Sequence, residues 1–192
     1  FTNEDLVRFA MNGEKMAGGA KHADNVTPCI YGGVTLIRSI FPLDIIPLNC
    51  PDLYITIVHP PIEVRTSDSR QILRKEVTLK NAIRQWGNIG GLIMGFTNKD
   101  LQLIGRSMED VIIEPVRSIL IPGFKEVKSL CKEAGALGGG ISGSGPSVFM
   151  FSEKEETAQK VEQVMNNIYE KIGVEYKTYV TSVNKAGVQI VK

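Results

Sequence analysis

The chain has 192 residues, of which 43% are hydrophobic, enough to form one large domain or parts of two. Its 22 Lys and Arg nearly balance its 21 Asp and Glu, so a net charge of +1 gives no global attraction to nucleic acid or a membrane surface. No apolar run approaches the roughly 20 residues of a membrane span. The three cysteines are scattered and follow no CxxC spacing, so we expect a reduced, cytoplasmic protein without a disulfide framework or zinc site.

The first part of the chain predicts two helices and a strand. A helix is expected from about Asn3, a plausible N-cap, until a pair of glycines breaks it. The loop "GAKHADNVTPCIYGG" then carries a short helix, for which Asp24 or Asn25 is a good N-cap. The segment "VTLIRSI" indicates a strand. Residues 41–52 hold three prolines and are the best candidate for a domain boundary, which divides the chain into 1–50 and 51–192.

The second part predicts strands at its ends and helices between them. The apolar strand "LYITIVH" begins at Leu53, and two strands, "EYKTYVTSV" and "GVQIV", end the chain. Helical patterns occupy residues 67–74, 78–94, 98–110, 122–134 and 153–171. This order favours an α+β fold with a mainly antiparallel sheet and helices packed on one face.

A glycine-rich stretch, "GALGGGISGSGPSVFMF", precedes a short apolar strand. Phosphate-binding loops of the P-loop and Rossmann types place their glycines after a strand and before a helix, which is the reverse order. The serine hydroxyls and backbone N–H groups of "SGSG" could form a concavity that accepts an anion or braces a neighbouring loop. The alternative is a tight bend between core strands.

Polar residues of the first part form two candidate sites. His22, Asp24 and Asn25 lie in a glycine-bounded loop and could together hold a small polar molecule, although Asp24 and Asn25 are also typical helix caps. Glu14 precedes this loop, and its carboxylate could reach a Mg²⁺ ion that bridges nucleotide phosphates. A lone helical glutamate is otherwise usually a solvated surface residue.

Two arginines stand among apolar neighbours in the second part. Arg70 in "RTSDSRQIL" and Arg117 in "EPVRSILIPGF" could converge on one carboxylate, because the planar guanidinium forms paired hydrogen bonds to it. The alternative is two ordinary surface ion pairs. His59, at a strand end beside two prolines, is interpreted as structural.

Taken together, these segments resemble the GHMP kinases, and within them the homoserine kinase branch. The segment "HADNVTPCIYGG" is similar to its H-x-D-N-v-x-P-x-x-x-G-G signature, and "GGGISGSGPSVFMF" resembles the third motif of the family. "TSDSRQIL" and "EPVRSILIPGF" resemble its T-x-x-x-R and p-x-R-x-x-L-I-P-G segments. The resemblance covers the whole chain in order. It implies a remnant of the N-terminal domain in 1–50 and a ferredoxin-like C-terminal domain in 51–192.

The resemblance also implies a role for each candidate residue. Glu14 corresponds to the acidic Mg²⁺ ligand and, with Asn25, is expected at the catalytic centre. His22, Asp24 and Asn25 are expected around the amino and hydroxyl groups of L-homoserine, with Asp24 binding the substrate and not abstracting a proton. The other implied residues are Thr66 in the pocket, Arg70 and Arg117 on the substrate carboxylate, and Gly143, Ser144 and Gly145 near the phosphates.

The implied reaction is ATP-dependent phosphorylation of L-homoserine in threonine biosynthesis, with ATP and Mg²⁺ as cofactors and a homodimer as one possible assembly. The family's ATP loop, P-x-x-x-G-L-G-S-S-A, does not occur in the sequence, so we expect a C-terminal portion that is inactive alone. Two alternatives stay open. One is a GHMP kinase for another alcohol such as mevalonate, and the other is a ligand-sensing domain with a ferredoxin-like fold.

Overall fold

The computed structural model describes residues 1–18, 21–63 and 71–191, and the chain forms two compact units. Unit 1 comprises Phe1–Pro51 together with Val183–Lys192, and unit 2 comprises Asp52–Ser182. Each unit has its own buried apolar cluster.

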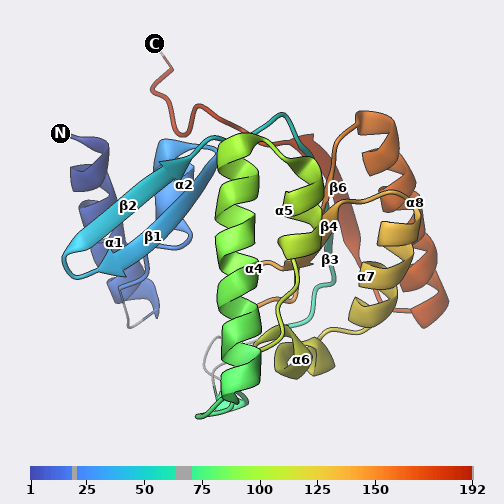
Figure 1. The fold of residues 1–192 in the computed structure, drawn as a ribbon. Coiled ribbons are helices and arrows are strands. Elements are labelled where there is room, and N and C mark those ends of the chain that lie inside the picture. The colour runs from blue at the N-terminus through green and yellow to red at the C-terminus, as the bar shows by residue number, and fades with distance from the viewer. Residues whose placement is uncertain (19–20, 64–70, 192) are drawn as a thin grey trace. The chain divides into compact units, whose positions relative to one another are not determined.

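Unit 1 combines two helices with a two-stranded antiparallel sheet (Figure 1). Its elements are α1 (Asn3–Gly18), α2 (Val26–Tyr31), β1 (Val34–Ile40) and β2 (Leu43–Leu48). The apolar face of α1 supplies Val7 and Met11, which are buried with Ala23 from the loop before α2. This core fixes α1 against the loop that the sequence singled out for its polar residues.

Strand β2 lies within residues 41–52, the stretch in which the sequence predicted a domain boundary and no strand. The prolines do not prevent pairing, because a two-stranded sheet has two edge strands and an edge position tolerates the missing N–H of proline. Pro47 faces Thr35 in the ladder, which runs from Val34 opposite Leu48 to Ile40 opposite Leu43.

The last described residues belong to unit 1, although the sequence placed them in the second domain and predicted a strand at 187–191. No strand is assigned to this described segment. Instead, Gly33 N–H donates to Asn184 O at 2.7 Å and Val188 N–H donates to Cys29 O at 2.8 Å. A Cβ on Gly187 would lie 2.3 Å from Ile30 O, so the absence of a side chain permits this close approach. The segment thereby braces α2.

Unit 2 is built on a four-stranded antiparallel sheet in the order β4-β5-β3-β6. Its strands are β3 (Tyr54–His59), β4 (Gly138–Ile141), β5 (Val148–Ser152) and β6 (Lys177–Ser182). Its helices are α4 (Leu79–Asn98), α5 (Leu101–Ser107), α6 (Glu114–Arg117), the 3₁₀ turn η1 (Ser118–Leu120), α7 (Phe124–Glu133) and α8 (Glu155–Ile172). None of the helices described in the two units is long and apolar enough to cross a membrane.

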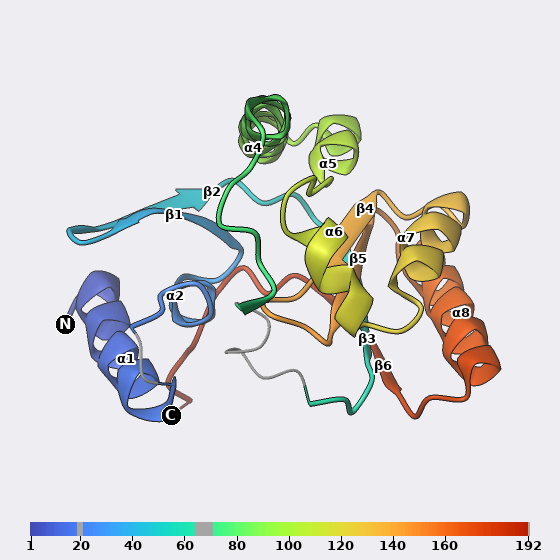
Figure 2. The same cartoon turned by 90° about the horizontal axis from the view of Figure 1, so that it is seen from below.

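The main core of unit 2 lies between one face of the sheet and helices α7 and α8 (Figure 2). Val58, Val148 and Met150 point to this face, as the alternation of side chains along paired strands requires. They pack with a larger set of buried side chains that includes Val127 of α7 and Val161, Met165 and Tyr169 of α8. The mainly antiparallel α+β fold predicted from the sequence is confirmed.

Helices α4 and α5 lie over the other face of the sheet, whereas the sequence predicted helices on one face. Phe96 of α4 is buried against Phe151 of β5, with ring centroids 6.5 Å apart. A Cβ on Gly105 would lie 2.6 Å from Leu137 O, so α5 approaches the edge strand β4 as closely as backbone allows. The spacing of apolar residues predicts which side of each of these two helices is apolar. It does not indicate which face of the sheet the helices cover.

The buried hydroxyl of Tyr169 has no hydrogen-bond partner among the described residues, and burial raises its pKa to about 12. We expect Tyr169→Phe to raise the free energy of unfolding by about 1 kcal/mol, because an unsatisfied buried hydroxyl is removed. The matched control is Tyr176→Phe, whose hydroxyl is exposed and donates to Glu170 Oε1 at 3.3 Å. Urea denaturation of the two variants tests this. A loss of stability in Tyr169→Phe would show that the hydroxyl is satisfied in the folded protein.

Candidate functional site

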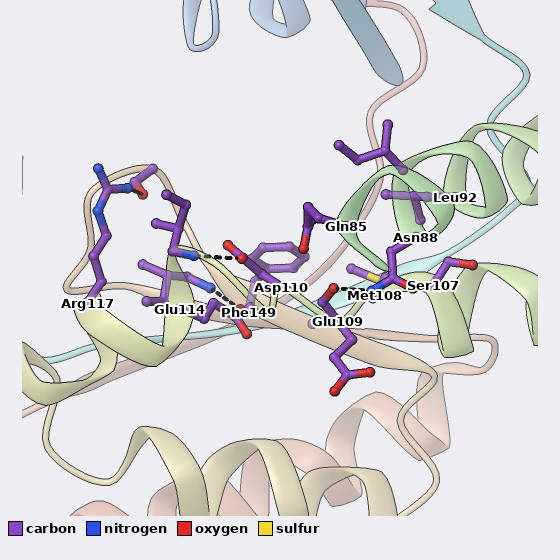
Figure 3. A pocket seen from close by; sticks show the side chains of 16 residues that line it. Gln85, Asn88, Leu92, Ser107, Met108, Glu109, Asp110, Glu114, Arg117 and Phe149 are labelled. Carbon is purple, nitrogen blue, oxygen red and sulfur yellow. Dashed lines mark hydrogen bonds between the residues drawn. The ribbon is translucent and has the colours of Figure 1, made fainter. Parts of the chain in front are cut away.

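The candidate site of unit 2 is a pocket of about 230 Å³ beside the edge strand β4 (Figure 3). Helix α4 forms one wall, the segment from α5 to α6 forms another, and β4 and β5 form the floor. Among the lining residues are Gln85, Asn88, Asp110, Glu114, Arg117, Gly140, Gly143 and Phe149. The pocket therefore contains one predicted carboxylate-binding arginine and one residue of the predicted glycine loop.

The segment between α5 and α6 is held in place by hydrogen bonds. Asp110 Oδ1 accepts from the N–H groups of Ile112 and Ile113, both at 2.8 Å. From α4, Asn88 Nδ2 donates to Glu109 O at 2.7 Å, and Gln85 Oε1 accepts from Val111 N–H at 3.0 Å. These contacts satisfy backbone groups of the segment between the two helices, and they hold it in one conformation up to the start of α6.

Arg117 meets the glycine turn. Its guanidinium Nη1 donates to Gly143 O at 3.1 Å, and the side chain is half-buried. The turn itself is closed by Ser142 N–H on Ser147 O at 2.8 Å and by Gly145 N–H on Ser142 O at 3.0 Å. Gly143 and Gly145 have φ of 60° and 86°, values that a side chain disfavours. The structure thus joins two segments that the sequence could only name separately.

His59 braces the same turn from strand β3. Its Nδ1 lies 2.9 Å from Ser147 Oγ, in a partly buried contact. The contact with Ser147, the residue at the end of the glycine turn, supports the structural role predicted for His59. Ser144, the third predicted residue of the turn, lies half-buried between Gly143 and Gly145.

Glu114 is a pocket residue that the sequence analysis missed. Its side chain is 12% exposed, and its Oε2 lies 2.6 Å from Nζ of Lys128, which is 19% exposed. Burial raises the pKa of the Glu114 carboxyl, although the hydrogen bond and charge of Lys128 act in the opposite direction. A glutamate within the apolar run "VIIEPV" was the available signal, because a charge among hydrophobic residues needs a partner when it is buried.

In unit 1, Glu14 and the loop of His22, Asp24 and Asn25 are carried by adjacent elements. Helical spacing places Glu14 on the face of α1 that also carries Val7 and Met11, the face packed against Ala23. Glu14 and His22 are half-buried, while Asp24 and Asn25 are exposed.

Asn25 fulfils only part of the alternative role that the sequence suggested for it, that of a helix cap. Asn25 occupies the N-cap position of α2, but its side chain makes no capping hydrogen bond. An N-cap residue usually accepts a hydrogen bond from the backbone two or three positions on, so the exposed amide is not used in the way that capping would require. This weakens the structural explanation for the residue and leaves room for ligand binding.

Two predicted residues, Thr66 and Arg70, lie outside the described residues. Arg117 and the glycine turn belong to unit 2, whereas Glu14 and the His22 loop belong to unit 1. The convergence of these groups on one substrate stays a prediction.

Glu14 of unit 1 is the predicted Mg²⁺ ligand. Among residues 1–18, 21–63 and 71–191, no group of three His, Cys, Asp or Glu side chains is placed to hold a metal ion. Mg²⁺ commonly takes one or two protein carboxylates and completes its shell with water and nucleotide phosphates. The half-buried carboxylate of Glu14 fits such a nucleotide-borne ion, and the donor set does not fit a structural metal centre.

The chain is similar to known proteins in sequence and in structure. Residues 92–171 match the family model for the GHMP kinases C-terminal domain. A curated homoserine kinase from Chloroherpeton thalassium is 50% identical over 172 residues, which cover 89% of this chain and 54% of that protein. The homoserine kinase of Pyrococcus furiosus is 36% identical over 183 residues, covering 95% of this chain and 61% of that protein. The chain thus spans little more than half the length of these relatives.

Solved structures show the same fold. A crystal structure of homoserine kinase from Cytophaga hutchinsonii matches with a TM-score of 0.93 and 52% identity, covering 97% of this chain and 60% of that one. A mevalonate kinase from L. major matches with a TM-score of 0.74 at 16% identity, a likeness that concerns the fold alone. Residues 92–171 therefore form a GHMP kinase C-terminal domain.

Proposed function

We propose that the protein carrying this chain is a homoserine kinase. It transfers the γ-phosphoryl group of ATP to the side-chain hydroxyl of L-homoserine and forms O-phospho-L-homoserine for threonine biosynthesis. The observation that carries the proposal is the contact between Arg117 and Gly143 O, in a chain half identical to homoserine kinases. A cation suited to a substrate carboxylate lies directly at the turn suited to a phosphate group.

The proposed substrate site uses residues of both units. Arg117, together with Arg70, binds the carboxylate of L-homoserine. His22, Asp24 and Asn25 surround its amino and hydroxyl groups, and Thr66 completes the pocket. The side-chain amide of Asn25 is exposed and makes no capping hydrogen bond, which supports this assignment. Phosphoryl transfer depends mainly on alignment and charge neutralisation, so no aspartate base is required and Asp24 binds the substrate.

The proposed nucleotide site uses Glu14 and the glycine turn of Gly143, Ser144 and Gly145. Glu14 would hold Mg²⁺ on the ATP phosphates, and that ion would supply positive charge where negative charge accumulates. The half-buried position of Glu14 supports this role, since partial burial strengthens its interaction with a cation. The N–H and O–H groups of the glycine turn would contribute donors near the phosphates.

We further propose that residues 1–51 belong to a nucleotide-binding domain and that residues 52–182 form the C-terminal domain, with 183–191 bracing α2. A cytoplasmic location stays a prediction. The homodimer stays a prediction.

A coupled ADP-release assay tests the function in the full-length kinase, meaning the protein that carries this chain together with its ATP loop. We expect turnover with L-homoserine and little with mevalonate, because mevalonate lacks the amino group that Asp24 would bind. A preference for mevalonate would support the other kinase. ADP release with none of a panel of small alcohols would favour a ligand-sensing protein.

A further inference from the structure

We propose that Glu114 is a positioning residue for the kinase reaction: held by Lys128, its carboxylate fixes α6 against β4 and so sets Arg117 at the glycine turn. This inference rests on the proposed function, because it concerns how Arg117 is presented to a substrate carboxylate. Glu114 itself need not touch the substrate.

The carboxylate of Glu114 links α6 to two other elements, α7 and β4. It lies on α6, its Oε2 is paired with Lys128 of α7 at 2.6 Å, and its Oε1 accepts from Ile141 N–H of β4 at 3.3 Å. A Cβ on Gly140 would lie 2.3 Å from Oε1, so the glycine of β4 provides the space in which the carboxylate sits. This explains one glycine of the triplet without any ligand.

The Glu114 carboxylate holds the chain on both sides of the contact between Arg117 and Gly143. Glu114 and Arg117 are the first and last residues of α6, a helix of four residues whose N-cap makes no side-chain hydrogen bond. A single helical turn is not stable by itself, so its orientation depends on tertiary contacts such as the one at Glu114. Ile141 is two residues before Gly143, so the same carboxylate also holds the chain that enters the turn.

Stability alone does not account for this pair. Burial of Glu114 raises the pKa of its carboxyl, and the nearby Asp110 raises it further, which means that the charged form is held at a cost. Apolar residues of similar size often stabilise a fold as well as a buried ion pair does, whereas the ion pair fixes one geometry. Fixing the geometry of Arg117 is the function that the surrounding contacts indicate.

The experiment measures steady-state kinetics of the full-length kinase with Lys128→Met, Glu114→Gln and Gly140→Ala, each alone and combined with Arg117→Ala. We expect each single variant to raise the KM for homoserine by about tenfold, because a small displacement of an oriented group has a large kinetic effect. The KM for ATP should stay within about threefold. In the Arg117→Ala background the same changes should have no further effect, since the group they position is absent.

Two controls separate positioning from general damage. Lys125→Met makes the same substitution at an exposed site one turn earlier on α7 and should leave both KM values unchanged. Lys128→Arg keeps the charge and should restore most of the homoserine affinity. Thermal denaturation of every variant reports stability independently of the kinetics.

The outcomes distinguish this inference from the proposed function. If Arg117→Ala leaves the homoserine KM unchanged, the proposed role of Arg117 is wrong, and the positioning role of Glu114 is overturned as well. If Arg117→Ala raises the KM but the other variants lower only the melting temperature, the pair is structural and the inference alone is overturned. A full additional effect of Lys128→Met in the Arg117→Ala background also overturns it. Should Glu114→Gln fail to fold, Gly140→Ala and Lys128→Met decide by the same criteria.

Discussion

Replacing Arg117 with alanine in the full-length kinase is expected to raise the KM for homoserine by roughly 30-fold or more and to leave the KM for ATP nearly unchanged. A paired arginine–carboxylate contact in a partly desolvated site contributes on the order of 2–4 kcal/mol. The half-buried position of Arg117 and its anchoring to Gly143 O favour such a contact, because the guanidinium is already oriented before the substrate arrives. Steady-state kinetics at saturating ATP provide the measurement.

The matched control for this prediction is Arg106→Ala, which removes an exposed arginine of α5 in the same unit. It should behave like the unmodified enzyme. Homoserine amide should be a poor substrate for the unmodified kinase and hardly a worse one for Arg117→Ala, since the analogue lacks the charge that Arg117 is proposed to bind. Lysine at position 117 should restore part of the affinity, because a point charge does not reproduce the planar fork. Normal homoserine affinity in Arg117→Ala would favour a different alcohol substrate.

The long helices could be predicted from sequence because their apolar spacing and a local signal at one end mark them. Helix α8 is amphipathic over 18 residues and ends at Gly173, which adopts the left-handed conformation expected of a C-cap. Helix α4 begins after Thr78, whose side chain accepts from Asn81 N–H. Strand β1 coincides with the predicted segment "VTLIRSI". In each case the local preference and the tertiary environment favour the same structure.

The missed elements depend on partners that are distant in the sequence. Strand β4 is nearly all glycine, a residue that local patterns assign to loops, and it forms because β5 pairs with it and helices approach it closely. The predicted strand at 187–191 has a suitable local pattern, but its backbone bonds to α2 instead. Helix α6 has four residues, too few for any periodic signal.

The candidate site was partly predictable for the same reason. Arg117 and the turn of Gly143 to Gly145 could be identified because their residue types and their resemblance to family segments are local properties. Their contact could not be predicted, because 26 positions separate Arg117 from Gly143. Glu114 was missed since its importance comes from Lys128 and Gly140, which are 14 and 26 positions away in the chain. The sequence therefore indicated which groups single residues could bind, but not the contacts that hold those residues in place.

Replacing Glu14 with glutamine should lower kcat of the full-length kinase by about 100-fold and leave the KM for homoserine nearly unchanged. Glutamine keeps the shape of the side chain and removes the charge, so the loss falls on neutralisation of the phosphates in the transition state. Glu14 shares a helix face with Val7 and Met11, which pack against Ala23 beside the proposed substrate loop, so the lost charge would lie on the face that packs against this loop.

The same helix provides a control for this prediction. Glu4 lies in the first turn of α1, where its carboxylate pairs with Arg8 in an exposed contact, and Glu4→Gln should leave kcat unchanged because such pairs contribute little. Raising the Mg²⁺ concentration should recover part of the activity of Glu14→Gln, since a weakened metal site is filled by mass action. A kcat within about threefold of the unmodified enzyme, a difference below roughly 1 kcal/mol, would make Glu14 an ordinary surface residue. The metal would then have to be held by groups outside α1.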